Sequence, residues 1–404
     1  MAVTCSCGAN NSVEWPHLKI AFDSWTLGSR FRHQGIYVYA RNLVEEFKHL
    51  AAEDPELEFC LFASRNSPGE FFNDASAVEP GSRFEVARTD LLESGRLWRL
   101  YGARMEAARV RADLIFSPTV AILPLGAVPL ICTIHDASSV FTPSHPRGVT
   151  LWLRSLLWWS AKFSRGIITD SESSKKDLME LYGLPESRVS AVHLGYDKRV
   201  FNESATAPEE QKMLLKRLGI TKPYILHHGT IQPRKNLGRL IAAYRLLLSR
   251  SASLDLELVL AGNRGWQCEE VMALAAKPGE GRVVFPGVLS DPDLARLIKG
   301  ACLVVVPSLY EGFCLPMVES MACGTPTIAA RASCLPEVSG GVLRYFDPYS
   351  VEEMADCMQQ VLEDTALREQ LARRGKERAA VFDWERCARE TIQALKTHMQ
   401  NGRN

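Results

Sequence analysis

The hydrophobic positions of this chain fall into short apolar runs separated by longer stretches with helical periodicity. Apolar runs in the first half predict strands at 18–23, 57–62, 113–117, 130–136, 166–171 and 189–194. The second half repeats the pattern, with predicted strands at 224–229, 256–262, 282–287, 302–308, 326–330 and 341–346. Short strands that alternate with amphipathic helices are typical of parallel sheets with crossover helices. The pattern therefore predicts an α/β fold.

The two series of strands indicate two domains. At 404 residues the chain exceeds a single ordinary core. A polar stretch at 202–219 separates the series and is predicted to contain the interdomain linker, while 37–50 and the region from Val351 onward are helical in pattern. We expect two Rossmann-like, doubly wound domains facing a central cleft, with ligands at the carboxyl ends of the strands. The predicted divisions are a disordered or extended tail (1–16), a first domain (17–200), a second domain (201–380) and a C-terminal helix packing back on the first domain (381–404).

Composition narrows the class of protein without naming a function. Forty-seven basic residues balance 47 acidic ones, so no global field attracts nucleic acid, and we expect no nucleic-acid partner. Most of the 11 cysteines lie in apolar runs, which is typical of reduced, buried thiols in a cytoplasmic protein. The first residues lack the pattern of a signal peptide, and no apolar run reaches the ~20 residues of a membrane span.

The segment "HHGTIQPRKNLGRLIAAY" (227–244) ends a predicted strand and opens a helix. Gly229 permits a tight exit from the strand, and Arg234 and Lys235 stand just before the helical periodicity. Two cations beside the positive end of a helix suit a phosphate-bearing ligand. The alternative is a solvated basic turn in which Asn236 caps the helix.

The segment "LYEGFCLPMVESMACGTPTIAA" (309–330) has the same strand–turn–helix form. Gly312 permits a close turn, the helix begins near Pro316, and the free amides around Cys314 and Leu315 can accept a diphosphate. Glu311 and Glu319 lie on either side of this anion site, where they would repel phosphate but could bind the hydroxyls of a sugar and a ribose. Alternatively, Glu311 is a surface residue and Glu319 complements the dipole of the first helical turn.

Two further segments bear on the chemistry. In "TIHDAS" (133–138), His135 stands at the carboxyl end of a first-domain strand, where it is either a ligand contact or a satisfied core histidine. The D-x-D in "SDPDLARL" (290–297) is interpreted as a helix start, with Ser290 or Asp291 as the cap and Pro292 in the first turn. We therefore expect no metal site there.

Taken together, the motifs resemble a retaining glycosyltransferase of family 4, one of the glycosyl transferases group 1 with the GT-B fold. The resemblance covers about residues 18–390 and rests on "GIYVYARNL", "TIHD", "GTIQPRKN", "EGFCLPMVE", "ACGTPTIAA", "LPEV" and "FDWERCARE", in that order. It departs from the family at Cys314, where a second glycine is usual, and in the first loop, whose two glycines are separated by six residues.

The resemblance implies a role for each matching position. Arg234 and Lys235 would hold the donor diphosphate and stabilise the departing charge, Glu311 would bind donor-sugar hydroxyls, and Glu319 would bind the nucleotide ribose. His135 would touch the sugar near the reaction centre. The implied donor-binding set is completed by the backbone of Cys314 and Leu315, by Gly229, Gly312 and Phe313, by Val288 beside Gly287 near the base, and by the loop from Gly28 to Gly35.

The same resemblance implies a reaction. A hexose would pass from a UDP-glucose-like or GDP-mannose-like donor to a glycan or lipid-linked saccharide, with retention of configuration and in polysaccharide biosynthesis. The enzyme would stabilise an oxocarbenium-like state and let the leaving phosphate assist acceptor deprotonation, with no cofactor and no metal. The alternatives are a GT-B relative with different chemistry, such as a sugar phosphorylase or a nucleotide-sugar epimerase, and a non-catalytic nucleotide-sugar-binding protein.

Two basic amphipathic stretches are compatible with contact between the protein and a membrane. Residues 96–111 hold five arginines against one glutamate, and 151–165 hold three cations and three tryptophans. For 96–111, peripheral contact with a membrane carrying a lipid-linked acceptor and packing of its apolar side on the sheet both remain open. The aromatic density of 151–165 favours core packing. If the membrane is bound, the protein would work at its inner face.

Overall fold

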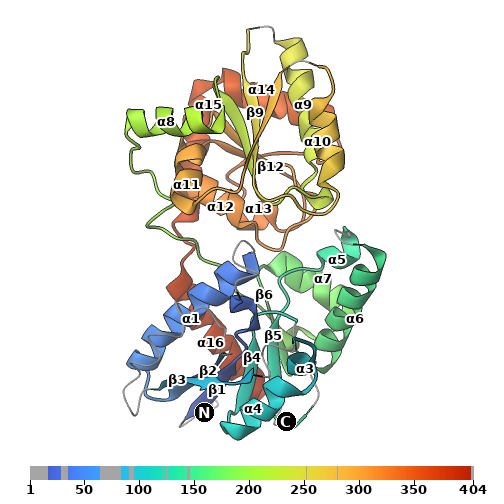
Figure 1. The fold of residues 1–404 in the computed structure, drawn as a ribbon, viewed down its shortest axis with the longest axis vertical. Coiled ribbons are helices and arrows are strands. Elements are labelled where there is room, and N and C mark those ends of the chain that lie inside the picture. The colour runs from blue at the N-terminus through green and yellow to red at the C-terminus, as the bar shows by residue number, and fades with distance from the viewer. Residues whose placement is uncertain are drawn as a thin grey trace, which may run out of the picture.

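The computed structural model describes residues 17–28, 35–63, 83–90, 95–120, 122–123, 126–142, 146–251, 253–279 and 281–401. These residues form two α/β lobes, each built on a parallel sheet (Figure 1). This confirms the predicted fold class. The predicted tail over 1–16 lies outside the described residues.

The first sheet has seven parallel strands in the order β3-β2-β1-β4-β5-β6-β7. Its strands are β1 (Leu18–Phe22), β2 (Leu57–Ala63), β3 (Phe84–Arg88), β4 (Leu114–Ser117), β5 (Leu130–Thr133), β6 (Gly166–Thr169) and β7 (Val189–Ala191). The helices of this part are α1 (Gly35–Glu53), α3 (Gly95–Leu97), α4 (Ala103–Arg109), α5 (Ser138–Phe141), α6 (Arg147–Phe163) and α7 (Glu172–Tyr182), with a 3-10 turn η1 (Trp25–Leu27) and a π-helical turn η5 (Trp98–Gly102).

The second sheet has six parallel strands in the order β10-β9-β8-β11-β12-β13. Its strands are β8 (Tyr224–His228), β9 (Glu257–Ala261), β10 (Arg282–Gly287), β11 (Leu303–Val306), β12 (Thr327–Ala330) and β13 (Arg344–Phe346). The helices are α8 (Pro208–Leu218), α9 (Leu237–Arg250), α10 (Cys268–Ala276), α11 (Asp291–Lys299), α12 (Leu315–Ala322), α13 (Leu335–Val338), α14 (Val351–Glu363), α15 (Thr365–Ala379) and α16 (Trp384–Gln400).

In each sheet the direction in which successive strands are added reverses next to the first strand of that sheet. In the first sheet β1 lies between β2 and β4, and in the second β8 lies between β9 and β11. Loops leaving the carboxyl ends of strands on either side of such a point diverge and leave room for a ligand. The central strands are fully buried, which explains their continuous apolar runs in the sequence.

Two features differ from the predicted elements. The edge strand β3 was not predicted, because "FEVAR" carries Glu85 and Arg88 and is buried only at Phe84. The polar stretch 202–219 contains the helix α8, which was not predicted. Its apolar residue Leu214 is buried while the charged residues face solvent. The cap predicted at "SDPDLARL" is present, since Ser290 Oγ accepts a hydrogen bond from the Asp293 amide.

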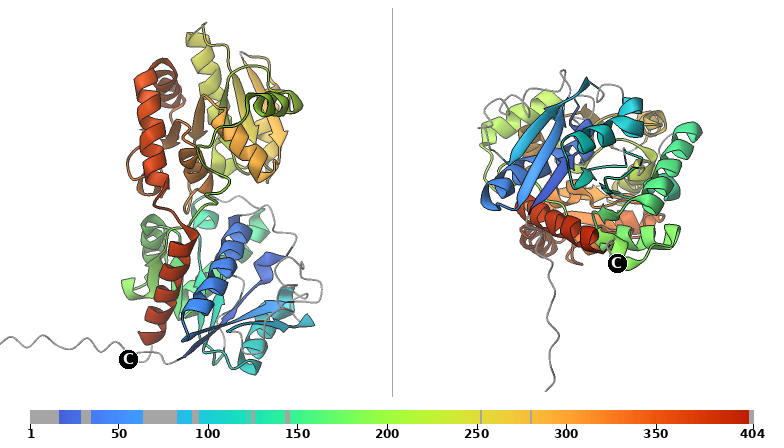
Figure 2. Two further views of the ribbon diagram at one scale, coloured as in Figure 1. Left: turned by 90° about the vertical axis from the view of Figure 1, so that its left-hand side faces the viewer. Right: turned by 90° about the horizontal axis from the view of Figure 1, so that it is seen from below.

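Helix α16 returns to the first lobe, as Figure 2 shows. It packs on α1, and Arg389 pairs with Glu53 at 2.8 Å. The ring of His398 lies against Gly166 of β6, where a Cβ would come within 2.2 Å. Asp383 starts this helix by accepting hydrogen bonds from the amides of Glu385 and Arg386. The chain therefore crosses between the lobes twice.

Side-chain contacts join the lobes on the α13 side. The Glu337 carboxylate accepts hydrogen bonds from the amides of Glu172 and Ser173, both at 2.8 Å, at the start of α7. His193 Nε2 lies 2.9 Å from the same carboxylate. Burial would raise the pKa of Glu337, but these donors outweigh burial and the pKa falls below its usual value. An ionised Glu337 thus complements the positive end of α7.

The interpretation of 151–165 as a core helix is wrong. Helix α6 covers this stretch, and Trp152, Trp158 and Trp159 are exposed. The helix instead packs through a narrow side that includes Thr150, Leu157, Ser160 and Ala161. The aromatic residues of this helix lie outside its inner side, so a high density of aromatic residues did not indicate burial. None of the helices in the described part of the chain is long and apolar enough to cross a membrane.

Candidate active site

A buried cluster of two cations and one carboxylate lies at the carboxyl edge of the second sheet. Arg234 Nη1 donates to Glu311 Oε2 at 2.6 Å, and Lys235 Nζ donates to Glu311 Oε1 at 2.6 Å. All three side chains are at least 87% buried. Arg234 also donates to the carbonyl of Tyr310. The cluster brings the two predicted motifs together around Glu311.

The electrostatics of this cluster favour the charged forms of Glu311 and Arg234. Burial would raise the pKa of the Glu311 carboxyl, but Arg234 and Lys235 outweigh it and lower this pKa to about 2. Burial would lower the pKa of Arg234, but Glu311 and then Asp136 of the first lobe raise it above its usual range. Two positive charges and one negative charge leave one net positive charge, which favours an anion at this edge.

The turn that presents the cations is held by Asn236. Residues Pro233–Lys235 form a single 3-10 turn, and Asn236 follows at φ 58° in the left-handed region before α9 begins. The Asn236 side-chain amide does not cap α9. It donates to the carbonyls of Pro307 and Pro348 at 3.1 and 2.7 Å, which ties the turn to two neighbouring loops. The basic turn is therefore a fixed, buried structure, unlike the solvated alternative.

Gly312 lies directly against the first lobe. A Cβ at this position would lie 2.3 Å from the His135 carbonyl oxygen and 3.1 Å from Asp136 Cβ. Cys314 adopts φ 76°, ψ 67°, a left-handed conformation that glycine takes at lower cost. The structure thus gives a backbone reason for glycine being usual where this chain has Cys314. Leu315 begins α12 directly after it.

Glu319 lies on the second turn of α12 and is not a complement to the first turn. Its side chain is 17% exposed, and its Oε2 lies 3.8 Å from His228 Nδ1. Burial, with a contribution from Asp291, raises the pKa of Glu319 to about 8. Burial lowers the pKa of His228 to about 3, so this imidazole is neutral and does not form an ion pair with Glu319. A protonated Glu319 can both donate to and accept from a hydroxyl group.

The raised pKa of Glu319 makes stability depend on pH. Between its unfolded value of about 4.5 and its folded value of about 8, the folded protein holds a proton that the unfolded chain has lost, so stability falls as pH rises. We expect the wild type to lose more thermal stability than Glu319→Gln between pH 6 and pH 8, by roughly 2–6 °C in Tm. Scanning calorimetry measures this, with the exposed Glu369→Gln as the control. Parallel pH profiles for wild type and Glu319→Gln would contradict a buried, protonated Glu319.

His135 is held inside the first lobe by both ring nitrogens. Its Nδ1 lies 2.8 Å from Asp170 Oδ2, and its Nε2 lies 3.0 Å from the carbonyl oxygen of Pro118. Burial opposes protonation, but the Asp170 carboxylate outweighs it and raises the pKa of His135. With both nitrogens donating, a hydrogen bond from this ring to a donor sugar requires one of the two existing hydrogen bonds to break. The contact stays a prediction.

The remaining predicted residues fall into four settings. Gly229 leaves β8 at φ 136°, and a Cβ on the adjacent Gly262 would lie 2.0 Å from the Gly229 carbonyl oxygen. Val288 follows β10 and is 49% exposed. Phe313 is buried against His193 and Phe382, at ring distances of 5.9 and 5.2 Å, so only its backbone is placed for a donor. Gly28 ends η1 and Gly35 begins α1, and the loop between them lies outside the described residues.

The sequence analysis missed several residues that support the site. Asp170 orients His135, Ser333 Oγ accepts from the Glu311 amide at 2.8 Å, and Gly262 permits the approach of Gly229. Asn236 was recognised only as a possible cap. "TDS" after β6 places Asp170 at a strand end, which is the signal that could have found it. Ser333 carries no such signal.

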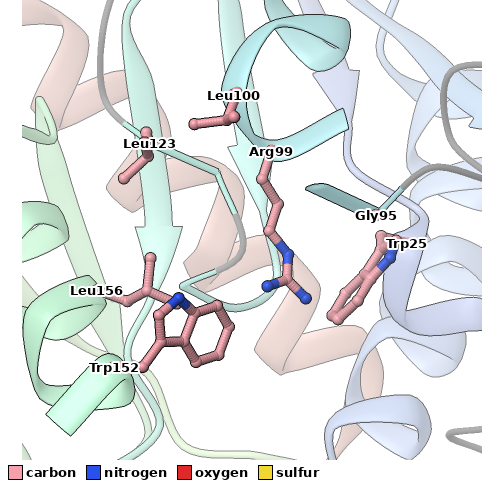
Figure 3. A pocket seen from close by; sticks show the side chains of 7 residues that line it. All are labelled: Trp25, Gly95, Arg99, Leu100, Leu123, Trp152 and Leu156. Carbon is pink, nitrogen blue, oxygen red and sulfur yellow. The ribbon is translucent and has the colours of Figure 1, made fainter. Parts of the chain in front are cut away.

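A cavity of about 520 Å³ lies in the first lobe between η1, η5 and α6. Figure 3 shows Arg99 between the rings of Trp25 and Trp152, at 4.2 and 5.0 Å from the two ring centroids. Leu100, Leu123 and Leu156 complete an apolar wall. Aromatic faces beside a guanidinium suit a saccharide ring or another amphipathic group.

Two doubly wound parallel sheets with a polar cluster at the facing edge define the GT-B class. Residues 211–378 match the family model "Glycosyl transferases group 1", and residues 34–200 match "Glycosyltransferase Family 4". O-antigen chain mannosyltransferase B of Escherichia coli is 32% identical over 372 residues, covering 90% of this chain and 96% of that protein. The chain therefore belongs to the group 1, family 4 glycosyltransferases.

Other relatives agree with this assignment. The serotype-specific mannosyltransferase WbdA of E. coli is 30% identical over 294 residues, covering 70% of this chain but 36% of that protein. Anabaena HepE, solved with UDP-glucose, has a TM-score of 0.68 and 22% identity, covering 94% of this chain and 99% of that chain. WaaG, a glycosyltransferase involved in lipopolysaccharide biosynthesis, has a TM-score of 0.63 and 15% identity, with 93% and 98% covered. These two solved structures share the fold.

Proposed function

We propose that this protein is a retaining hexosyltransferase that moves a hexose from a nucleotide sugar to a saccharide or lipid-linked saccharide in polysaccharide biosynthesis. The observation that carries the proposal is the buried Arg234–Glu311–Lys235 cluster at the carboxyl edge of the second sheet. The relatives support it, since two are mannosyltransferases and HepE was solved with UDP-glucose. The donor is UDP-glucose-like or GDP-mannose-like.

In this proposal the cluster binds the donor diphosphate and stabilises its departure. Glu311 holds both cations in place before the ligand arrives, so little reorganisation is needed when charge develops on the leaving phosphate. Their net positive charge acts without a metal ion or a cofactor. The leaving phosphate then assists deprotonation of the acceptor. The Glu311 carboxylate also accepts hydrogen bonds from hydroxyls of the donor sugar, through the oxygen lone pairs that Arg234 and Lys235 do not use.

We assign the ribose, the acceptor and the membrane to residues around this cluster. Glu319 binds the nucleotide ribose, and its buried, protonated carboxyl offers both a donor and an acceptor to the two hydroxyls. Residues 201–380 carry the donor and 17–200 the acceptor. The acceptor partner reaches the enzyme in the cytoplasm at the inner face of a membrane, with peripheral contact through 96–111. Leu97, Tyr101 and Met105 of that stretch are exposed, while Trp98 is buried and donates to Asp23.

Thermal-shift measurements with UDP-, GDP- and ADP-sugars, without added metal, test the donor assignment. A ligand that binds the folded state raises Tm by mass action. We expect a clear rise with one nucleotide series, and a roughly 10- to 100-fold weaker Kd for that donor in Glu319→Ala because buried hydrogen bonds to the ribose are lost. The exposed Glu369→Ala is the control.

The outcomes separate the competing functions. No rise in Tm with any series would point to a degenerate or phosphorylase-like cleft, and unchanged donor affinity in Glu319→Ala would overturn the ribose assignment. Isomerisation of the donor sugar without an acceptor would identify an epimerase instead.

A further inference from the structure

Helix α6 carries an exposed apolar surface that the transfer reaction does not use. Leu151, Trp152, Trp158, Trp159 and Phe163 are 63%, 46%, 44%, 39% and 51% exposed. Trp152, Trp159 and Phe163 are spaced by seven and four residues and so share one side of the helix, and Leu151 and Trp158 lie on the adjoining side. The opposite side, with Thr150, Leu157 and Ala161, is buried. Five large apolar side chains thus lie on the solvent-facing half of this helix, and we call their surface the α6 face.

The rings at the C-terminal end of the α6 face are packed on one another. Trp158 and Trp159 meet edge to face at 5.4 Å, Trp159 and Phe163 lie at 4.8 Å, and Trp158 and Phe163 lie at 5.9 Å. Three large aromatic side chains therefore form one exposed cluster rather than scattered residues. Monomeric soluble proteins rarely expose such contiguous apolar area unless it binds something.

The charges of the helix indicate what covers this face. Residues 147–163 contain Arg147, Arg154 and Lys162 and neither aspartate nor glutamate. Arg147 is exposed, and Lys162 is exposed while its Nζ donates to the carbonyl of Tyr182. Arg154 is part-buried and donates to the carbonyls of Ser139 and Val140. A helix with exposed tryptophans, two exposed cations and no acidic residue matches the interface of an anionic bilayer, where indole rings sit at headgroup level.

We propose that the α6 face lies on an anionic lipid surface and inserts its aromatic cluster at the headgroup level. A second copy of this chain is a poorer occupant. A two-fold interface between two α6 helices would bring the exposed cations Arg147 and Lys162 of one helix toward the same two on the other, without carboxylates from either helix to offset them. The proposal differs from contact through 96–111, because it places the main anchor on another helix. Arg99 stacks on Trp152 and joins the two segments.

Vesicle flotation without any nucleotide sugar tests this proposal, so its outcome is independent of the proposed transfer reaction. We expect the wild-type protein to float with phosphatidylglycerol vesicles, to bind phosphatidylcholine vesicles weakly, and to be released as salt concentration rises. Trp159→Ala combined with Phe163→Ala should lower the partition coefficient about tenfold or more, because the inserted apolar area is lost. Trp159 is 39% exposed and Phe163 is 51% exposed, so the variant should stay folded, which calorimetry checks.

Matched controls make the test specific. Met213→Ala combined with Tyr349→Ala removes exposed apolar side chains, 64% and 65% exposed, from the second lobe and should leave flotation unchanged. Absence of wild-type binding to anionic vesicles would overturn the proposal. Full vesicle binding by the Trp159→Ala, Phe163→Ala variant would also overturn it. If the Tyr101→Ser, Met105→Ser variant loses vesicle binding and the α6 variant does not, the membrane contact lies on 96–111. Self-association that the α6 variant abolishes, with no vesicle binding, would identify a second copy as the occupant.

Discussion

Replacing Lys235 with alanine is expected to lower kcat about 100- to 1,000-fold while donor affinity changes less than about tenfold. Lys235 Nζ is buried against Glu311 at 2.6 Å, where it is fixed before the reaction begins. A preorganised charge of this kind contributes about 3–4 kcal/mol when it stabilises charge that develops only in the transition state. Glu311 keeps Arg234 as its partner in the variant, so the carboxylate is not left buried and unpaired.

The measurement is steady-state kinetics with the donor identified by thermal shift, together with direct titration of donor binding. The control is Lys222→Ala, because Lys222 is 46% exposed and pairs with Asp255 at the surface. A variant that binds donor much more weakly but turns over at the wild-type rate would show that Lys235 acts in ground-state binding and not on the leaving group.

The sequence predicts an element well when the local pattern of residues reflects the burial of that element. The 12 strands predicted from apolar runs are all present, because buried parallel strands are apolar on both faces and stand out between helices. Edge strand β3 lacks that signature. Helix α6 shows the opposite failure, since its aromatic residues extend beyond the narrow side that packs on the sheet and are exposed.

The candidate site divides in the same way. Motif order placed Arg234, Lys235 and Glu311 at one sheet edge, and the structure brings them into contact. The ion pairs of Arg234 and Lys235 with Glu311 could not be predicted from the sequence, because the partners are more than 70 residues apart along the chain. The partners of His135 are likewise set by the neighbouring strand and loop and not by local pattern. Whether these residues touch the donor stays a prediction.

Gly312→Ala is expected to lower both stability and activity, although the change adds a single methyl group. The new Cβ would lie 2.3 Å from the His135 carbonyl oxygen, and because that atom belongs to backbone it cannot rotate away. The lobes must therefore shift apart at the turn that joins Glu311 to Cys314. Overpacking of this size costs about 1–3 kcal/mol. Misplacement of reacting groups by about 1 Å lowers turnover about 100-fold.

Calorimetry and kcat/KM measure the two effects, with Gly148→Ala as the matched control. A Cβ at Gly148 meets no atom within 4 Å, so that variant should keep the wild-type Tm and rate. Donor binding separates the causes in Gly312→Ala. Most of the donor contacts are assigned to the second lobe, with His135 and the loop from Gly28 to Gly35 as the exceptions, so a separation of the lobes should reduce transfer more than donor affinity. Equal losses of donor affinity and transfer would place the damage in the donor turn itself, and wild-type behaviour would show that the lobes do not need to meet at Gly312.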